Sequence, residues 1–478
     1  MESYTIKARQ APGSASKCRL MKTLVVTLCV SVILYSCEEF VEIDNPPTQI
    51  PSENVFSNES TATAAIVGIY ARMFKTGGIT SAMTRSNGLV ADELVAYSGT
   101  EDINFYNNNL SPISNTIGSY WSELYQYIYS ANLALEGLSS SETINNETTR
   151  QLRGEAKFIR AFCYFYLTNL WREVPLITST DYRLNASETR NTREEIYDQI
   201  VRDLRDAEDD LPDDYAVSNG DRSRPNKWAA KALLARVYLY TADWSNAAAE
   251  ATAVIGNELL FVLEDDVGSV FLKNSREAIW QLSSTFSGGG INTFDAEIFI
   301  STSTTSIPTM ALDTELIKSF TPNDERRINW RDSIIVSGTT YHYPYKYKVE
   351  AAGSMPPITE YLMVLRLAEL YLIRAEARLH ESDMEGARAD INAIRQRAGL
   401  PDTPANDEPE LLLAIEQERR FELFAEWGHR WLDLKRTQRA DAVLGLLKPN
   451  WQSTDVLYPL PQSEMDKNPN LIPQNDGY

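Results

Sequence analysis

Apolar residues recur at helical spacing through most of the chain after residue 58, in long segments with no proline in their interior. Charged and small polar residues fill the positions between them, as in helices that bury one face. The pattern predicts a mainly α-helical chain. The predicted helical segments are 60–74, 119–138, 148–171, 192–212, 226–256, 360–380, 385–399 and 409–436.

Two of these segments resemble each other at a shift of 140 residues. Each copy contains a helix, a short turn at an aspartate and a second helix, with small residues where the helices would cross. This pattern is typical of tetratricopeptide-like (TPR-like) helical hairpins, which bury their apolar faces by stacking on neighbours. The aligned residues are Ala235 with Ala375, Leu239 with Leu379, Asp243 with Asp383 and Ala247 with Ala387.

Two stretches lack helical periodicity. Residues 257–358 are rich in serine, threonine, glycine and aromatic residues, with a glycine-rich hinge at 288–290, and they predict short strands and long loops. Residues 76–118 are the second irregular stretch. Long ordered loops on a helical scaffold often carry function. We therefore expect one domain over 59–478, in which a scaffold (59–256 and 359–478) holds a loop-rich insertion (257–358).

The N-terminal segment is typical of an export signal. A basic residue precedes an apolar run over 24–35, which is shorter than the roughly 20 residues that span a bilayer. Residues 34–37 resemble a bacterial lipobox, in which the cysteine thiol receives a diacylglycerol. An ordinary signal peptide with a chance cysteine is the alternative. We predict a signal peptide over 1–36, lipid attachment at Cys37 and a tether over 37–58.

Two further features bear on this segment. Glu38 and Glu39 resemble the acidic export signal of surface lipoproteins in Bacteroidetes-type bacteria, so we expect the protein at the cell surface, anchored in the outer membrane. Residues 1–20 carry four basic residues and do not resemble a signal peptide, so we interpret Met21 as the true start. Removing residues 1–36 changes the net charge from -21 to -25, because five basic residues and one acidic residue are lost.

Charge and composition exclude several function classes. A net charge of -21 repels the phosphates of nucleic acids. The four cysteines, at 18, 29, 37 and 163, form neither a disulfide framework nor a CxxC site, and the three histidines lie far apart. We therefore expect no metal site and no cofactor. No nucleotide-binding, serine-hydrolase or zinc-protease motif is present, so we expect no enzyme. A surface hydrolase remains an alternative, because glycosidases need only two acids.

Charged residues within the predicted helices suggest ion pairs. At about 100° per residue, Arg366, Glu369, Glu376 and His380 fall on one arc of the segment 360–380. A catalytic carboxylate pair is one interpretation, and buried ion pairing between stacked hairpins is the interpretation we prefer. The arginines and glutamates between the aromatic residues of 418–436 predict structural ion pairs and cation–π contacts in the same way.

The irregular stretches contain aromatic and amide side chains of the kind that bind sugars. Sugar rings present C–H faces that stack on aromatic rings, and their hydroxyls bind amide and carboxylate groups. The alternative is that these rings only pack the loops onto the scaffold. The candidate ligand residues are Tyr97, Phe105, Tyr106, Asn107, Trp280, Phe286 and Phe294.

Several stretches together resemble one family, the SusD-like (RagB/SusD) outer-membrane lipoproteins. The most specific is "ERRFELFAEWGHRWLDLKR" at 418–436. In the stretch 151–177, Arg172 and Glu173 stand where the family usually has Gly-Asp. The other similar stretches are 224–251, 364–377 with 391–401, and 458–478.

The resemblance implies a scaffold of TPR-like helix pairs under a loop-rich face. It implies a surface lipoprotein that covers a SusC-like, TonB-dependent outer-membrane barrel, captures oligosaccharides and passes them on without chemistry. The alternatives are a peptide or other nutrient as ligand, or a TPR-type scaffold that binds only the barrel. Asp92 resembles a recurrent acid of the family and joins the ligand candidates, although a structural role is open. The implied partners are the barrel, a glycan and, through Cys37, the lipid of the outer membrane.

Overall fold

Long helices lie side by side in the computed structural model, which describes residues 3, 5, 55–75, 78–287, 290–351 and 356–478. Residues from Val55 onward form a unit with its own core, to which everything below refers. The predicted signal peptide, Cys37 and the tether as far as residue 54 lie outside the described residues.

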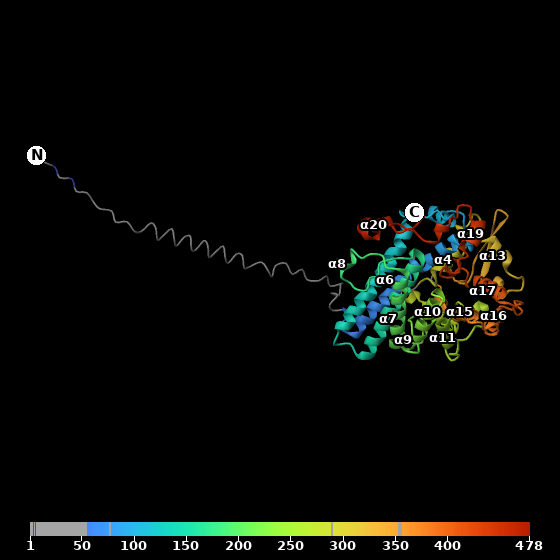
Figure 1. Cartoon of the computed structure of the whole chain (residues 1–478), viewed down its shortest axis with the longest axis horizontal. Helices are drawn as coiled ribbons and strands as arrows, with labels where there is room; N and C mark the ends of the chain where they lie inside the picture. The colour runs from blue at the N-terminus through green and yellow to red at the C-terminus, as the bar shows by residue number, and fades with distance from the viewer. Residues whose placement is uncertain (1–2, 4, 6–54, 76–77, 288–289, 352–355) are drawn as a thin grey trace. The chain divides into compact units, whose positions relative to one another are not determined.

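The first helices each start at a capping residue and pack as neighbours through their buried apolar residues, with α7 buried on all sides over most of its length. In Figure 1, α6 (Asn115–Ser140) and α7 (Asn146–Trp171) lie next to each other, and α7 also packs against α9 (Arg193–Asp210). The Asn145 side chain accepts a hydrogen bond from the Thr148 backbone N–H and so caps α7. α3 (Glu59–Met73) packs against α6 and α7.

The two similar hairpins are confirmed. α10 (Lys227–Tyr240) pairs with α11 (Trp244–Ile255), and α15 (Leu367–His380) pairs with α16 (Met384–Arg397). The turn has the same construction in both copies: a residue with positive φ precedes an aspartate whose side chain caps the second helix, Asp243 for α11 and Asp383 for α16. Because α11 packs against α15, the two hairpins stack on each other.

The segment 360–380 is not one continuous helix, although its sequence suggested that it is. Its first residues form β6 (Leu362–Arg366), which pairs antiparallel with β2 (Ala278–Leu282), and α15 starts directly afterwards. All residues of both strands are buried. A short, fully buried apolar run does not distinguish a strand from a helix, and the partner strand lies in the distant loop-rich insertion.

The segment 409–436 is also divided, into α17 (Glu408–Leu423) and α18 (His429–Arg436). Ala425, Trp427 and Gly428 all have positive φ at the break. A side chain at Gly428 would lie 2.4 Å from the Cβ of Asn87, so the close approach of another helix requires glycine here.

The stretch 76–118 contains more helix than we expected. It holds α4 (Ile79–Val90) and α5 (Thr100–Tyr106), separated by the short strand β1 (Leu94–Ala96). α4 packs against α5, α6 and α18, and this tertiary packing compensates for its serine- and threonine-rich sequence.

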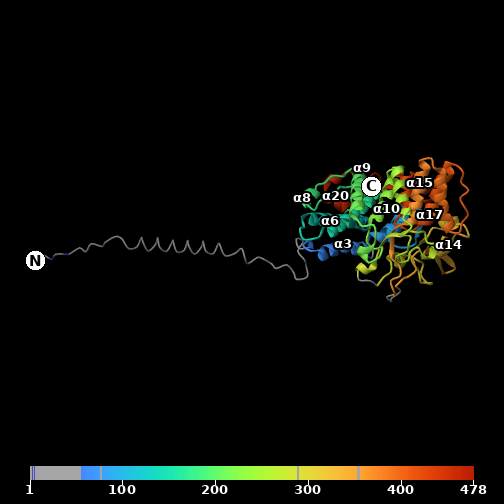
Figure 2. The ribbon, with the colours of Figure 1, turned by 90° about the horizontal axis from the view of Figure 1, so that it is seen from below.

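The insertion 257–358 contains the short strands and loops that the sequence predicted, and also short helices that it did not predict. β3 (Met310–Leu312) pairs antiparallel with β1, and β4 (Arg331–Val336) forms a hairpin with β5 (Thr339–Pro344). Figure 2 shows this yellow part of the chain on one side of the helix layer. The remaining helices are α8 (Tyr182–Asn185), α12 (Phe294–Phe299), α13 (Thr314–Ser319), α14 (Glu325–Asn329), α19 (Ala440–Leu447) and α20 (Gln462–Lys467), and the short 3-10 helices are η1 (Ala216–Ser218), η2 (Val267–Ser269), η3 (Ser284–Ser287), η4 (Ser453–Val456) and η5 (Pro469–Leu471).

A buried ionic network joins the insertion to the C-terminal helices, as the charge pattern of 418–436 suggested. The Arg366 guanidinium donates to the carboxylates of Glu277, Glu422 and Glu426. Lys346 pairs with Glu426 and lies 4.2 Å from the ring centre of Phe424. Arg326 and Arg397 share Glu422 with Arg366.

The remaining charges of the arc predicted in 360–380 also have structural partners. Arg236 of the first hairpin donates to both carboxylate oxygens of Glu369, and Arg436 of α18 donates to both oxygens of Glu376. His380 stacks on Trp244 at 4.0 Å between ring centres. The preferred interpretation, buried ion pairing between stacked hairpins, is therefore confirmed for Glu369, whereas Glu376 pairs with α18, outside the two hairpins.

Candidate ligand-binding face

Three tyrosines from separate parts of the chain gather beside the small β1–β3 sheet, and we call Tyr97, Tyr106 and Tyr341 the tyrosine ledge. Tyr97 follows β1 and is fixed by its backbone N–H, which donates to the Thr309 carbonyl at 2.8 Å. Its ring meets the Tyr341 ring edge to face at 5.2 Å, and 45% of the residue is exposed. Tyr106 ends α5 and is half-buried. The ledge thus offers ring surface to solvent from a supported position.

The surroundings of the ledge are polar. Burial, the neighbouring tyrosines and the Asp313 carboxylate raise the pKa of Tyr97, and burial and Asp313 raise that of Tyr106. The Lys448 ammonium lies 3.9 Å from the ring centre of Tyr106 and donates to the carbonyl of the same residue. The hydroxyls of Tyr97 and Tyr106 therefore remain protonated at neutral pH and available as hydrogen-bond donors.

Burial lowers the pKa of Lys448 to about 7, against the opposing effect of Asp313 and Asp92. The ammonium has a second acceptor in the Leu89 carbonyl at 2.8 Å. Lys448 therefore holds the end of α4 and the end of α5 together beneath the ledge.

Two candidates from the sequence lie in the core, which corrects our expectation for them. Trp280 is 0% exposed in β2, where its ring packs against Phe158 and Phe162 and its indole N–H donates to the Ser223 carbonyl. Phe105 is 1% exposed and packs against Tyr458. A ring without an exposed face cannot stack on a sugar, so both serve as core residues here.

Of the other candidates, two are half-buried and one has a side chain outside the described part. Phe294 is half-buried, with its ring 5.1 Å from that of Phe74. Asn107 is half-buried beside Tyr106, where its backbone N–H caps α5. Phe286 lies in the 3-10 helix η3, and its side chain lies outside the described part.

Asp92 has a structural partner set. It is buried, and Arg430 donates to both of its carboxylate oxygens at 2.7 and 3.0 Å, while Arg420 pairs with it at 2.8 Å. Burial alone would raise its pKa, but these arginines hold the pKa below its ordinary value. The carboxylate is therefore charged and fully engaged within the protein.

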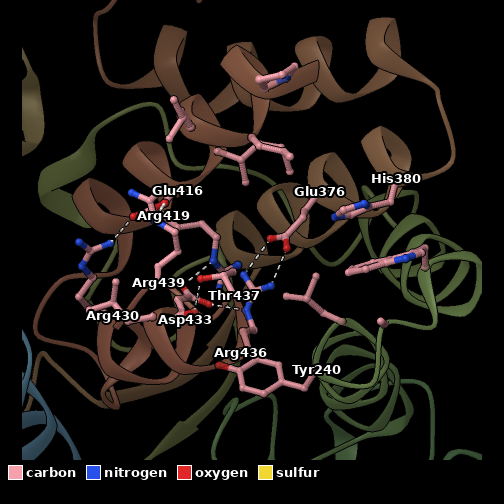
Figure 3. A pocket seen from close by; sticks show the side chains of 18 residues that line it. Tyr240, Glu376, His380, Glu416, Arg419, Arg430, Asp433, Arg436, Thr437 and Arg439 are labelled. Atoms are coloured by element: carbon pink, nitrogen blue, oxygen red, sulfur yellow. Dashed lines mark hydrogen bonds and ion pairs between the residues drawn. The ribbon is translucent and has the colours of Figure 1, made fainter. Parts of the chain in front are cut away.

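A pocket of about 610 Å³ lies away from the ledge, between the hairpin helices and α18 (Figure 3). Its acids are paired with arginines: Asp433 accepts from Arg419 and Arg436, and Glu376 accepts from Arg436. Burial raises and the arginines lower the pKa of Asp433, which lies far below its ordinary value. Carboxylates held in this way are poor proton donors, so the pocket does not resemble a glycosidase site.

Possible metal sites and membrane-spanning helices were sought among the described residues. Among them, no group of histidine, cysteine and acidic side chains is arranged to hold a metal ion. Within the same residues, no helix combines the length and apolar character needed to cross a bilayer.

The sequence did not single out Tyr341, Asp313 or Lys448. Tyr341 belongs to "TTYHYPYKYK", within the stretch for which the sequence predicted short strands and long loops, and it stands two residues from Tyr343 in β5. Strand alternation was the available signal, because it places every second residue on the same face.

Comparison with known proteins agrees with the fold and with the motifs. Residues 39–239 match a family described as "Starch-binding associating with outer membrane", and residues 333–455 match the "SusD family". SusD-like protein P2 of Formosa agariphila is 29% identical over 96% of this chain and 100% of its own length. The starch-binding protein SusD of Bacteroides thetaiotaomicron is 25% identical over 72% of this chain and 74% of its own.

Solved structures show the same architecture. A laminarin-binding SusD-like protein is 26% identical, with a TM-score of 0.74 over 88% of this chain and 100% of its own. A SusD superfamily protein from Bacteroides vulgatus gives a TM-score of 0.78 over 88% of this chain and 99% of its own; at 20% identity it supports the fold alone. Motifs, family matches and architecture agree across both halves of the chain, which therefore belongs to the SusD-like family, a family of glycan-binding proteins.

Proposed function

We propose that the protein is a surface lipoprotein of the outer membrane that binds oligosaccharides and delivers them to a SusC-like, TonB-dependent barrel. The observation that carries the glycan part is the tyrosine ledge, where exposed ring surface lies beside hydroxyl, carboxylate and amide groups. That combination suits the apolar C–H faces and the hydroxyls of sugars. The similarity to a laminarin-binding protein supports the same ligand class.

The location rests on separate features. The apolar run and the Cys37 lipobox support export and lipid attachment, and the family description supports association with the outer membrane. Delivery to a barrel rests on family membership. We propose no catalytic role, because the acids of the pocket in Figure 3 are held by arginines.

Substitution of the ledge tests the glycan site. The purified protein would first be screened on an array that includes laminarin and starch fragments, and each hit would be titrated by calorimetry. Loss of one stacked ring costs roughly 1–3 kcal/mol, so among Tyr97→Ala, Tyr106→Ala and Tyr341→Ala at least one variant should bind more than about fivefold more weakly. The melting temperature should change little, because Tyr97 is half exposed.

A matched control comes from the opposite end of the described part. Tyr182 on α8 is 77% exposed, and Figure 2 places α8 far from α14, which leads into the β4–β5 hairpin. Tyr182→Ala should therefore bind the glycan like the wild type. Wild-type affinity in all three ledge variants would refute the proposed site. Binding of no glycan at all, together with binding of a peptide or of the barrel alone, would favour the two alternative functions.

A further inference from the structure

A second pocket, of about 490 Å³, lies where the C-terminal end of α7 meets α9, α18 and α19. Its ionisable lining residues are Arg172, Arg193, Lys435, Arg436 and a single acid, Asp441. Cationic residues outnumber acids four to one in this lining, in a chain whose net charge is -21. The local field is therefore opposite in sign to that of the whole protein.

Three of the four cations have no carboxylate partner among the described residues. Arg193 donates to the Tyr240 carbonyl at 2.9 Å, and Lys435 donates to the Asn169 carbonyl. For the Arg172 side chain, the described part of the chain offers neither an ion pair nor a hydrogen bond. Arg436 differs, because Glu376 and Asp433 occupy it fully.

The one acid does not neutralise these cations. Asp441 accepts a hydrogen bond from the indole N–H of Trp451 at 2.8 Å. Elsewhere in the described residues, buried arginines such as Arg160, Arg326 and Arg366 are paired with carboxylates. Arg222 and Lys448 are also held by backbone carbonyls alone, so the distinguishing feature of this pocket is that three cations without a carboxylate partner line it together.

Arg193 and Lys435 lie close enough to affect each other. Burial, and to a smaller extent the positive charge of Arg193, lower the pKa of Lys435 to about 7. Two like charges at the edge of a protein interior repel each other, and an anion between them would remove that cost.

We propose that this pocket binds a tetrahedral dianion, that is, a sulfate or phosphate group. Guanidinium groups donate pairs of hydrogen bonds to such oxygens, and an ammonium group adds a third donor. The group can be a free inorganic anion or an ester on a sugar. The site is separate from the tyrosine ledge, so it does not depend on the proposed glycan binding there.

The test is a calorimetric titration of the purified full-length protein with sodium sulfate, compared with sodium fluoride at equal ionic strength. Arg193→Gln removes one charge-assisted contact and should weaken sulfate binding by about tenfold. Arg202→Gln is the matched control, since Arg202 lies on the same helix, is exposed and does not line the pocket. It should bind sulfate like the wild type.

Arg172→Gly separates binding from stability. Arg172 has φ +70°, a conformation that glycine adopts without strain, so this variant should melt at the same temperature or higher. Its affinity for sulfate should nevertheless fall by about tenfold. A melting temperature that falls together with unchanged sulfate affinity would show a structural role and overturn the assignment of Arg172.

The pH dependence provides an independent readout. Sulfate should bind more tightly at pH 6 than at pH 8, because Lys435 is protonated below its pKa, and Lys435→Met should lose most of this difference. The charged residues that line the pocket are Arg172, Arg193, Lys435, Arg436 and Asp441, and Asp455 lies on η4, which also lines it. Apart from Lys435, these are arginines and aspartates, whose ordinary pKa values lie outside this range.

These titrations can overturn the proposal and can identify the source of the anion. Equal heats from sulfate and fluoride, or equal weakening by Arg193→Gln and Arg202→Gln, would overturn the proposal. Galactose 6-sulfate, galactose and inorganic sulfate distinguish the sources of the anion. Tighter binding of the sulfated sugar than of both others identifies an ester on a sugar, and equal binding of the sulfated sugar and inorganic sulfate identifies the anion alone.

Discussion

Glu422 is the acid shared by three arginines in the buried network, and Glu422→Gln tests what the network contributes to stability. Its side chain is 0% exposed. One carboxylate oxygen accepts from Arg366 at 2.6 Å and from Arg397, and the other accepts from Arg326 at 3.0 Å. Glutamine keeps the shape of the side chain but replaces one oxygen by an NH2 group, which faces a guanidinium donor.

The loss of stability in Glu422→Gln depends on which carboxylate partners the arginines keep. Arg366 keeps Glu277 and Glu426, and Arg326 keeps Asp324 and Glu418, so no cation is left without a carboxylate. Breaking a buried ion pair costs about 3–5 kcal/mol, and a lost charge-assisted hydrogen bond about 1.5–3 kcal/mol. We expect the free energy of unfolding to fall by about 3 kcal/mol.

Urea denaturation followed by circular dichroism measures this change. Glu315→Gln is the control, because Glu315 forms an exposed pair with Lys318 and should cost less than about 1 kcal/mol. Burial alone would raise the pKa of Glu422, but Arg397, Arg366 and Arg326 hold it well below the ordinary value. The contribution of the charge is therefore complete above about pH 4.5 and is lost as the pH falls, so the difference between the two proteins should shrink in acid. A loss below about 1 kcal/mol at pH 7 would refute the reasoning.

Three further predictions follow from single groups. Trp431 is 0% exposed in the helical core, so Trp431→Ala should cost about 3–5 kcal/mol in a thermal melt, whereas Tyr97→Ala should melt like the wild type. Burial and the charge of Asp92 raise the pKa of Glu93 to about 8. The wild type should therefore lose stability relative to Glu93→Gln as the pH rises from about 4.5 to 8, by on the order of 3 kcal/mol at pH 7, and equal pH profiles in urea titrations would contradict this. Cys37→Ala should remove labelled palmitate and membrane association in cell fractionation, and equal label in both proteins would exclude the lipobox.

Local signals explain what the sequence predicted correctly about the fold. The hairpin turns were predictable because Asp243 and Asp383 cap the helices that follow them, and a cap acts over a few residues. β6 was not predictable, since its partner β2 lies in another part of the chain. The break between α17 and α18 was missed for a related reason, because the neighbour that requires Gly428 is Asn87, far away in sequence.

The candidate site depends even more on contacts between distant parts of the chain, which the sequence does not reveal. Composition identified aromatic residues in irregular stretches, but it could not distinguish Tyr97, which is half exposed, from Trp280 and Phe105, which are buried. Exposure depends on which distant element covers a ring. Tyr341 was overlooked because its partnership with Tyr97 exists only after β1 and the β4–β5 hairpin meet.

Asp92 shows how the scaffold sets the geometry of the ledge. It precedes β1, the strand that leads directly into Tyr97, and it is held by Arg420 of α17 and Arg430 of α18. The next residue, Glu93, accepts a hydrogen bond through its carbonyl from the backbone N–H of Asp313, the carboxylate beside the ledge. The break between α17 and α18 therefore places two arginines on a single acid, and that acid positions the strand that presents the ring. An acid that sequence similarity suggested as a ligand residue thus supports the tyrosine ledge through the backbone, without an exposed oxygen of its own.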